Sequence, residues 1–168
     1  MLPVTERINQ KNNEIENLDG INVKSSSGRD YTAKRPEALS ILEYRIANDP
    51  ANYPLISDGI FEYDFIHDGR KMSPSGKHKG EWLDFKGDHT YTFGKNKNQM
   101  GSGRYHYDFE KQLLLMIDDN ENVNPQEWEI KRQGDVMIKV GNMVYGNNNF
   151  QIKLTQYADV AGMMSVPD

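Results

Sequence analysis

The side chains that could bind a metal or move a proton are few and scattered along this chain. Four histidines occur, His67, His78, His89 and His106. No two of them have the His-x-His or His-x3-His spacing that brings imidazoles together on one strand or helix. They fall in or beside different predicted hairpins, so we expect surface histidines and no metal site.

Nucleophiles in a recognisable setting are also missing from the sequence. No Gly-x-Ser-x-Gly, P-loop or dinucleotide fingerprint occurs, and Gly101-Ser102-Gly103 lies in a predicted loop. Asp84 or Glu62 would face inward only if a strand register slipped by one residue. We therefore expect no catalytic residues and no enzyme, with an unrecognised cavity site as the alternative.

One acidic loop imitates a calcium-binding pattern. Asp118, Asn120, Asn122 and Glu129 stand at the first, third, fifth and twelfth positions of a twelve-residue loop. Val123 replaces the glycine required at the sixth position, and no helices are predicted beside the loop. We interpret this stretch as a solvated polar hairpin.

A basic loop follows the first predicted strand. It contains Arg70, Lys71, Lys77, His78 and Lys79, and Lys86, Lys95 and Lys97 could lie near it. Such a loop could form an anion-binding rim or a weak nucleic-acid contact. Charged loops are usually solvated surface, and we favour that interpretation.

Composition limits the function classes. The 168 residues carry 20 Lys and Arg against 25 Asp and Glu, a net charge of −5, which argues against a general nucleic-acid binder. The absence of cysteine excludes disulfides, thiolate sites and a lipobox. No signal-peptide core or membrane span is recognisable. We expect a cytoplasmic protein without a cofactor, unless a leader was trimmed.

The chain divides into a polar start, one helix and a long β region. Residues 1–34 are predicted to be a partly disordered arm. Residues 35–57 are predicted to form a helix and a connector packed on the β-barrel that follows, with the helix over 35–48 at one end of that barrel. Pro36 suits the first turn, and Leu39, Leu42 and Ile46 recur at helical spacing. Residues 158–168 form a tail.

Residues 58–157 read as successive short strands joined by turns, which is typical of an antiparallel up-and-down β-barrel of about eight strands. Alternation places one set of residues on the inner face, where they either fill the core or line a ligand pocket: Phe61, Tyr63, Phe65, Phe85, Tyr91, Phe93, Tyr105, Tyr107 and Trp128. Phe109, Val136, Ile138 and Val140 are predicted to face inward as well.

Residues 59–154 resemble the lipocalin-like domains of the calycin group, in their divergent bacterial form. The resemblance rests on the runs Trp82–Phe93, Gly103–Tyr107, Leu113–Leu115 and Trp128–Ile130. Gly80-Glu81-Trp82 matches the family signature Gly-x-Trp but lies on the second predicted strand. The resemblance implies a barrel that carries a small hydrophobic molecule.

We therefore predict a lipocalin-like binding protein for a small hydrophobic or aromatic ligand, held by the inward aromatic residues. Two alternatives stay open, a protein-interaction module with a filled core and a small-molecule enzyme. The expected partners are a small hydrophobic ligand and no nucleic acid, and the expected state is a monomer or a weak homo-oligomer.

Overall fold

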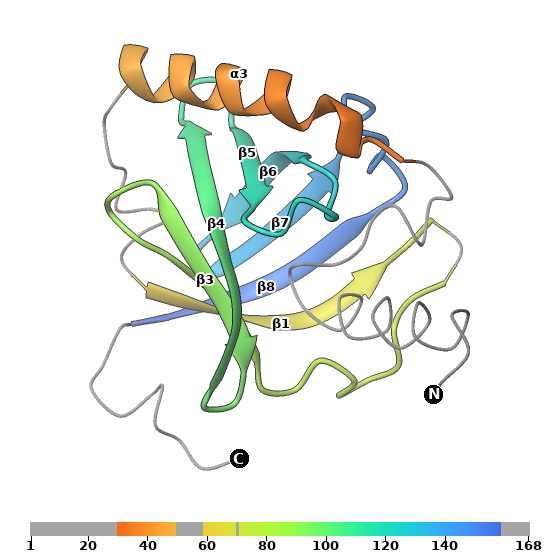
Figure 1. Cartoon of the computed structure of the whole chain (residues 1–168). Coiled ribbons are helices and arrows are strands. Elements are labelled where there is room, and N and C mark those ends of the chain that lie inside the picture. The colour runs from red at the N-terminus through yellow and green to blue at the C-terminus, as the bar shows by residue number, and fades with distance from the viewer. Residues whose placement is uncertain (1–29, 50–58, 70, 159–168) are drawn as a thin grey trace, which may run out of the picture.

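The computed structural model describes residues 30–49, 59–69 and 71–158, which fold into a closed antiparallel barrel with one helix beside it (Figure 1). Eight strands follow one another around the barrel in chain order, and the last pairs with the first. The strands are β1 Gly59–His67, β2 Glu81–Phe85, β3 Thr90–Lys95, β4 Asn98–Asp108, β5 Leu113–Asp118, β6 Gln126–Gln133, β7 Val136–Gly141 and β8 Gln151–Ala158. The predicted fold class is confirmed.

The two ends of the barrel differ in their connections. The short-turn end holds residues 86–89, 109–112 and 134–135, and the long-loop end holds residues 68–80, 96–97, 119–125 and 142–150. At the short-turn end, Asp88 Oδ1 accepts a hydrogen bond from the Thr90 backbone at 3.1 Å. Gly134, at φ 57°, opens the two-residue turn before β7.

Glycines on the inner face of β4 make room for aromatic rings from β3. A Cβ atom at Gly103 would stand 2.4 Å from Tyr91 Cζ, and one at Gly101 would stand 2.3 Å from Phe93 Cζ. The loop predicted before Arg104 is wrong in part, because β4 already begins at Asn98. The small residues there continue the strand, since the neighbouring rings occupy the space that side chains would need.

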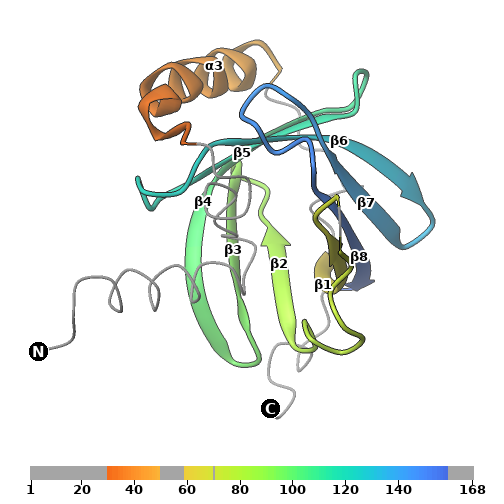
Figure 2. The ribbon, with the colours of Figure 1, turned by 90° about the vertical axis from the view of Figure 1, so that its right-hand side faces the viewer.

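Helix α3, Arg35–Asn48, has the predicted bounds but lies on the outer wall of the barrel instead of at an end (Figures 1 and 2). Its buried residues Ala38 and Leu42 pack against Leu115 and Ile117. Those two residues alternate with the core residues Leu114 and Met116 on β5, so they face outward. The outer wall is apolar here because the helix covers it.

The start of the described chain is fixed to the barrel. A 3₁₀ turn, η1 (Thr32–Lys34), precedes the helix. The Tyr31 backbone donates to Asn124 Oδ1 at 2.9 Å, and Arg35 Nη1 donates to the Asp118 carbonyl at 2.5 Å. Most of the predicted arm lies outside the described residues. No helix in the described part of the chain is long and apolar enough to cross a membrane.

Candidate functional site: the barrel interior and its two ends

Most of the predicted ligand-binding residues meet inside the barrel. All of them except Phe65 belong to one buried cluster and are at most 7% exposed: Phe61, Tyr63, Phe85, Tyr91, Phe93, Tyr105, Tyr107 and Trp128. They come from β1, β2, β3, β4 and β6, so the barrel closure brings together residues far apart in the sequence. The shared inner face follows from strand alternation.

Phe65 is the exception, and its predicted inward position is wrong. The pairing of β1 with β8 shifts register between Tyr63 and Phe65, which marks a β-bulge. A bulge adds one residue to a strand and so reverses which side chains face inward beyond it. Ile66 packs on the core instead, while Lys153 Nζ lies 5.9 Å from the Phe65 ring centre.

The aromatic side chains contact one another edge to face. The rings of Phe85 and Tyr105 lie 4.8 Å apart at 70°, and those of Phe61 and Phe85 lie 6.0 Å apart at 82°. The Tyr105 hydroxyl donates to the Lys86 carbonyl at 2.7 Å. Burial raises the pKa of Tyr105 well above its ordinary value, and Asp88 and Asp84 raise it further. This hydroxyl is therefore a neutral donor at ordinary pH.

The inward face of β7 is the opposite of the predicted one. Met137 and Lys139 are buried, while Val136, Ile138 and Val140 are only half-buried. The two-residue turn fixes a register in which Ile130 pairs with Lys139, and residues paired across strands share a face. Because Ile130 faces the core, Lys139 does too, although the neighbouring residues are more apolar.

Lys139 is an unusual side chain for the interior of a barrel. It is fully buried, with Nζ 4.7 Å from the centre of the Trp128 ring and 3.8 Å from Met116 Sδ. The Trp128 indole N–H donates to Gln126 Oε1 at 3.0 Å. The centre of the barrel thus combines an aromatic face with an amine and an amide.

A second basic side chain lies inside the short-turn end. The Arg132 guanidinium lies 5.5 Å from the centre of the Phe61 ring and binds Gln156 Oε1. Arg132 Nε also donates to the Gly134 carbonyl at 2.8 Å. Burial lowers the pKa of Arg132, an effect that Asp135 opposes, and burial raises the pKa of the nearby Tyr107. Phe109, predicted to face inward, is instead 45% exposed in the turn after β4.

The long-loop end contains a buried histidine–carboxylate pair. His78 and Glu81 are 3% and 2% exposed, and His78 Nδ1 contacts Glu81 Oε2. The His78 ring lies 6.4 Å from the ring of Tyr63, an inner-face residue. The expectation that His78 lies on the surface is wrong, because the loop before β2 folds over this end of the barrel.

His106 is buried too, but on the outer wall. It faces away from the core, as predicted, and the end of α3 covers it, so it is 2% exposed. Its Nε2 lies 3.2 Å from the Asp49 carbonyl and 3.3 Å from Asp49 Oδ2. Burial lowers the pKa of His106, with Asp49 opposing and His89 and Arg45 reinforcing the effect.

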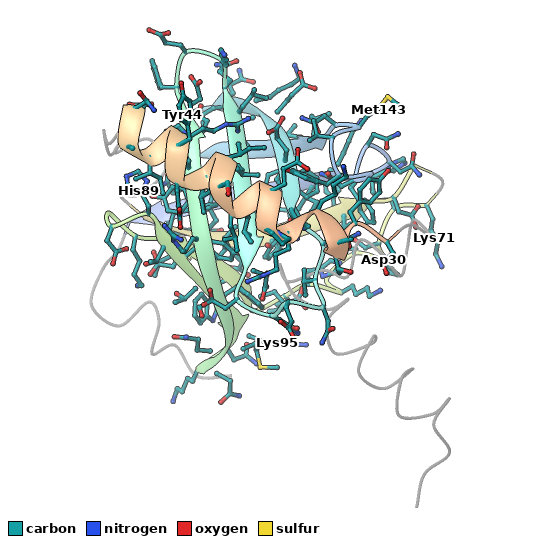
Figure 3. All side chains as sticks on the ribbon, turned by 45° about the horizontal axis from the view of Figure 1, so that its top comes forward. Asp30, Tyr44, Lys71, His89, Lys95 and Met143 are labelled. Carbon is teal, nitrogen blue, oxygen red and sulfur yellow. The ribbon has the colours of Figure 1, made fainter. Side chains whose placement is uncertain are left out.

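The acidic loop after β5 is a polar turn held by its own side chains. Asp118 Oδ1 accepts a hydrogen bond from the Asn120 backbone N–H, and Asn120 Oδ1 accepts one from the Asn122 backbone N–H. Lys71, Lys77 and Lys79 are exposed (Figure 3 shows Lys71 and Lys95). Among the described residues, no group of three or more His, Asp or Glu side chains could hold a metal ion.

Sequence reasoning missed most of the polar groups of the interior. Arg132 could have been found by continuing the alternation of Trp128 and Ile130, and Glu81 by extending that of Leu83 and Phe85 backward. Lys139 follows from the two-residue turn Gly134-Asp135, which fixes the hairpin register. His78 carries no such signal, since a long loop brings it into place.

Comparisons with known proteins return similarities of shape only. No family model matches the chain, and no curated protein matches it. A solved structure of a DUF4847 family protein from Bacteroides vulgatus is 11% identical, covers 62% of this chain and 96% of its own, and has a TM-score of 0.46. A protein from Bacteroides uniformis is 19% identical, with coverages of 63% and 92% and a TM-score of 0.41.

Proposed function

We propose that this protein is a lipocalin-like barrel of the calycin group that binds one small, largely apolar or aromatic molecule inside the barrel. We propose binding and not catalysis, because two polar groups of the aromatic interior already bond to the backbone or to another side chain. The hydroxyl of Tyr105 and the indole N–H of Trp128 are both used in this way.

The observation that carries the proposal is the polar content of the inner face. Burying a charged or amide side chain costs stability, so a core that serves stability alone is apolar. This barrel instead places Lys139 against Trp128 and Arg132 against Phe61. Ligand sites combine an aromatic lining with a few placed polar groups, and this interior has that composition.

Native mass spectrometry of the protein as purified, under mild activation, tests the proposal. We expect one retained small molecule per chain, and its mass then restricts the chemical identity of the ligand. A clean mass of the protein alone, together with no uptake of added aromatic compounds, would contradict the proposal. The cytoplasmic location and the monomeric or weakly associated state stay predictions, and the same spectrum measures the second.

Trp128 gives an independent optical test. Its ring lies in the core, whereas Trp82 faces the other side of β2 and its indole N–H donates to the Asn96 carbonyl at 2.9 Å. In a Trp82→Phe variant, emission comes from Trp128 alone and should change when a ligand enters the barrel. In the matched Trp128→Phe variant, the emission of Trp82 should stay nearly constant under the same titration.

A further inference from the structure

We propose that His78, held by Glu81, is a polar anchor at the long-loop end of the barrel and binds a neutral hydrogen-bond donor of the ligand, a hydroxyl or an amide N–H. This inference rests on the proposed function and narrows its ligand class. It assigns a role to a buried pair that the aromatic lining does not explain.

Glu81 belongs to the interior by its position on β2. It alternates with Leu83 and Phe85, which are fully buried core residues. Strands β1 and β2 are antiparallel, with Phe61 paired to Leu83. Two residues further along β1, Tyr63 therefore lies beside Glu81. The carboxylate therefore lies at the edge of the aromatic lining and not on the outer surface.

The chain holds His78 in place through a turn that is itself fixed. Gly76 and Gly80 have φ values of 78° and 85°, which side chains rarely allow. The Glu81 backbone N–H donates to the His78 carbonyl at 3.0 Å, and the Asn96 N–H donates to the Gly80 carbonyl at 2.8 Å. The second bond ties the loop to the β3–β4 turn, so the imidazole is positioned before any ligand arrives.

The contact with Glu81 decides what the other ring nitrogen does. A carboxylate beside Nδ1 favours the tautomer that carries its proton there, which makes Nε2 an acceptor. Nε2 is buried, and no group among the described residues forms a hydrogen bond with it. A buried polar atom of this kind is stabilised when a donor reaches it.

The tautomer of His78 defines the ligand group further. With the proton on Nδ1, which contacts Glu81 Oε2, Nε2 presents a lone pair and needs a ligand group that carries a proton. An ionised carboxylate has acceptors only and cannot donate to this nitrogen, so it is disfavoured as the occupant. A neutral hydroxyl or amide N–H satisfies Nε2, and the adjacent Tyr63 ring offers an apolar surface for the rest of the ligand.

Isothermal titration calorimetry with two matched probes tests the anchor. The probes are 2-naphthol, which has a hydroxyl donor, and 2-methoxynaphthalene, which has none. We expect the wild-type protein to bind 2-naphthol about tenfold more tightly, the effect of one buried hydrogen bond. In His78→Leu the two probes should bind with about equal affinity, while the binding of 2-methoxynaphthalene is retained.

Two further variants keep the test decisive. Glu81→Gln removes the carboxylate that keeps the His78 proton on Nδ1, so it should reduce the preference for 2-naphthol. This variant tests the anchor if His78→Leu does not fold. His67→Gln changes the histidine at the end of β1, whose Nδ1 accepts from the Gly69 N–H at 3.1 Å, and should leave the preference unchanged.

The outcomes separate the two proposals. Equal binding of both probes to the wild-type protein, or a preference that survives in His78→Leu and in Glu81→Gln, would overturn the anchor and leave the proposed function standing. If neither probe binds the wild-type protein, the anchor is overturned, and the proposed function is overturned as well only if native mass spectrometry also gives a clean mass of the protein alone.

Discussion

At the scale of single residues, the unexpected feature is how many polar side chains the barrel interior accepts. Lys139, Arg132 and His78 each lie against an aromatic ring of the inner face. Aromatic faces stabilise cations, and a carboxylate fixes the imidazole, so the burial of each group has a local compensation. These residues are the ones whose replacement should alter binding more than folding.

Tyr105 should be important for stability. It is 2% exposed, packs on Phe85 and donates to the Lys86 carbonyl. Tyr105→Ala should lower the free energy of unfolding by about 3–5 kcal/mol, as large-to-small changes in cores do. Tyr105→Phe removes only the hydrogen bond and should cost about 1 kcal/mol. Urea unfolding measures both, and a near-unchanged midpoint for Tyr105→Ala would place this side chain outside the core.

His106 should make stability depend on acid. Burial lowers its folded-state pKa below the ordinary value, so the unfolded chain takes up a proton more readily than the folded protein. The resulting stability is present above the unfolded-state pKa of about 6.5 and is lost as the pH falls through the lower folded-state pKa. His106→Gln should therefore lose less stability than the wild-type protein between about pH 7 and pH 5, measured by urea unfolding.

His67→Gln is the matched control for that measurement. His67 lies at the end of β1 and is only half-buried, unlike His106. Its removal should leave the acid-dependent loss of stability close to that of the wild-type protein. An equal effect of the two substitutions would mean that the burial of His106 beneath the helix has no energetic consequence.

At the scale of elements, two local devices decide which side chains enter the core. The bulge in β1 turns Ile66 inward in place of Phe65. The two-residue turn before β7 turns Lys139 and Met137 inward in place of Val140 and Ile138. In β7 the inward Lys139 is not the residue that hydrophobicity selects, whereas in β1 both Phe65 and Ile66 are apolar. Hydrogen-bond register therefore outweighs side-chain preference where the two conflict.

The bulge can be tested by comparing its two neighbours. Ile66 packs against the core, whereas Phe65 faces outward beside Lys153. Ile66→Ala should lower the free energy of unfolding by about 2 kcal/mol, and Phe65→Ala by less than about 1 kcal/mol, although it removes more atoms. Guanidinium unfolding of the two variants gives the order, and the reverse order would show that regular alternation continues through β1.

At the scale of the whole molecule, closure of the barrel pairs the first and last strands, and helix α3 covers part of the outer wall. Pairing of β1 with β8 closes the barrel, so neither strand is left as an edge that could pair with another chain. Helix α3 covers the outer wall of β5, and Arg45 contacts Glu127 of β6 at 3.1 Å. Figure 3 shows Tyr44 on the exposed side of this helix.

Contacts at the start of the described chain predict how far the chain can be shortened before its stability falls. Deleting residues 1–29 should leave the melting midpoint nearly unaltered, because that segment has few apolar side chains to bury. Deleting residues 1–33 should lower stability by about 1–3 kcal/mol, because it also removes Tyr31, which packs against the helix cluster and bonds to Asn124. Thermal unfolding of the two truncations compares them, and equal midpoints would show that Tyr31 contributes nothing.

The amino-acid sequence by itself determined the helix over 35–48, the succession of short strands, and the core position of eight of the nine aromatic residues predicted to line the barrel. These follow from local periodicity and turn chemistry, which act over a few residues. Only the tertiary structure decided that Phe65 faces outward and that His78 meets Glu81. Those positions depend on pairing between distant strands and on a loop folded over one end, and no local pattern encodes such contacts.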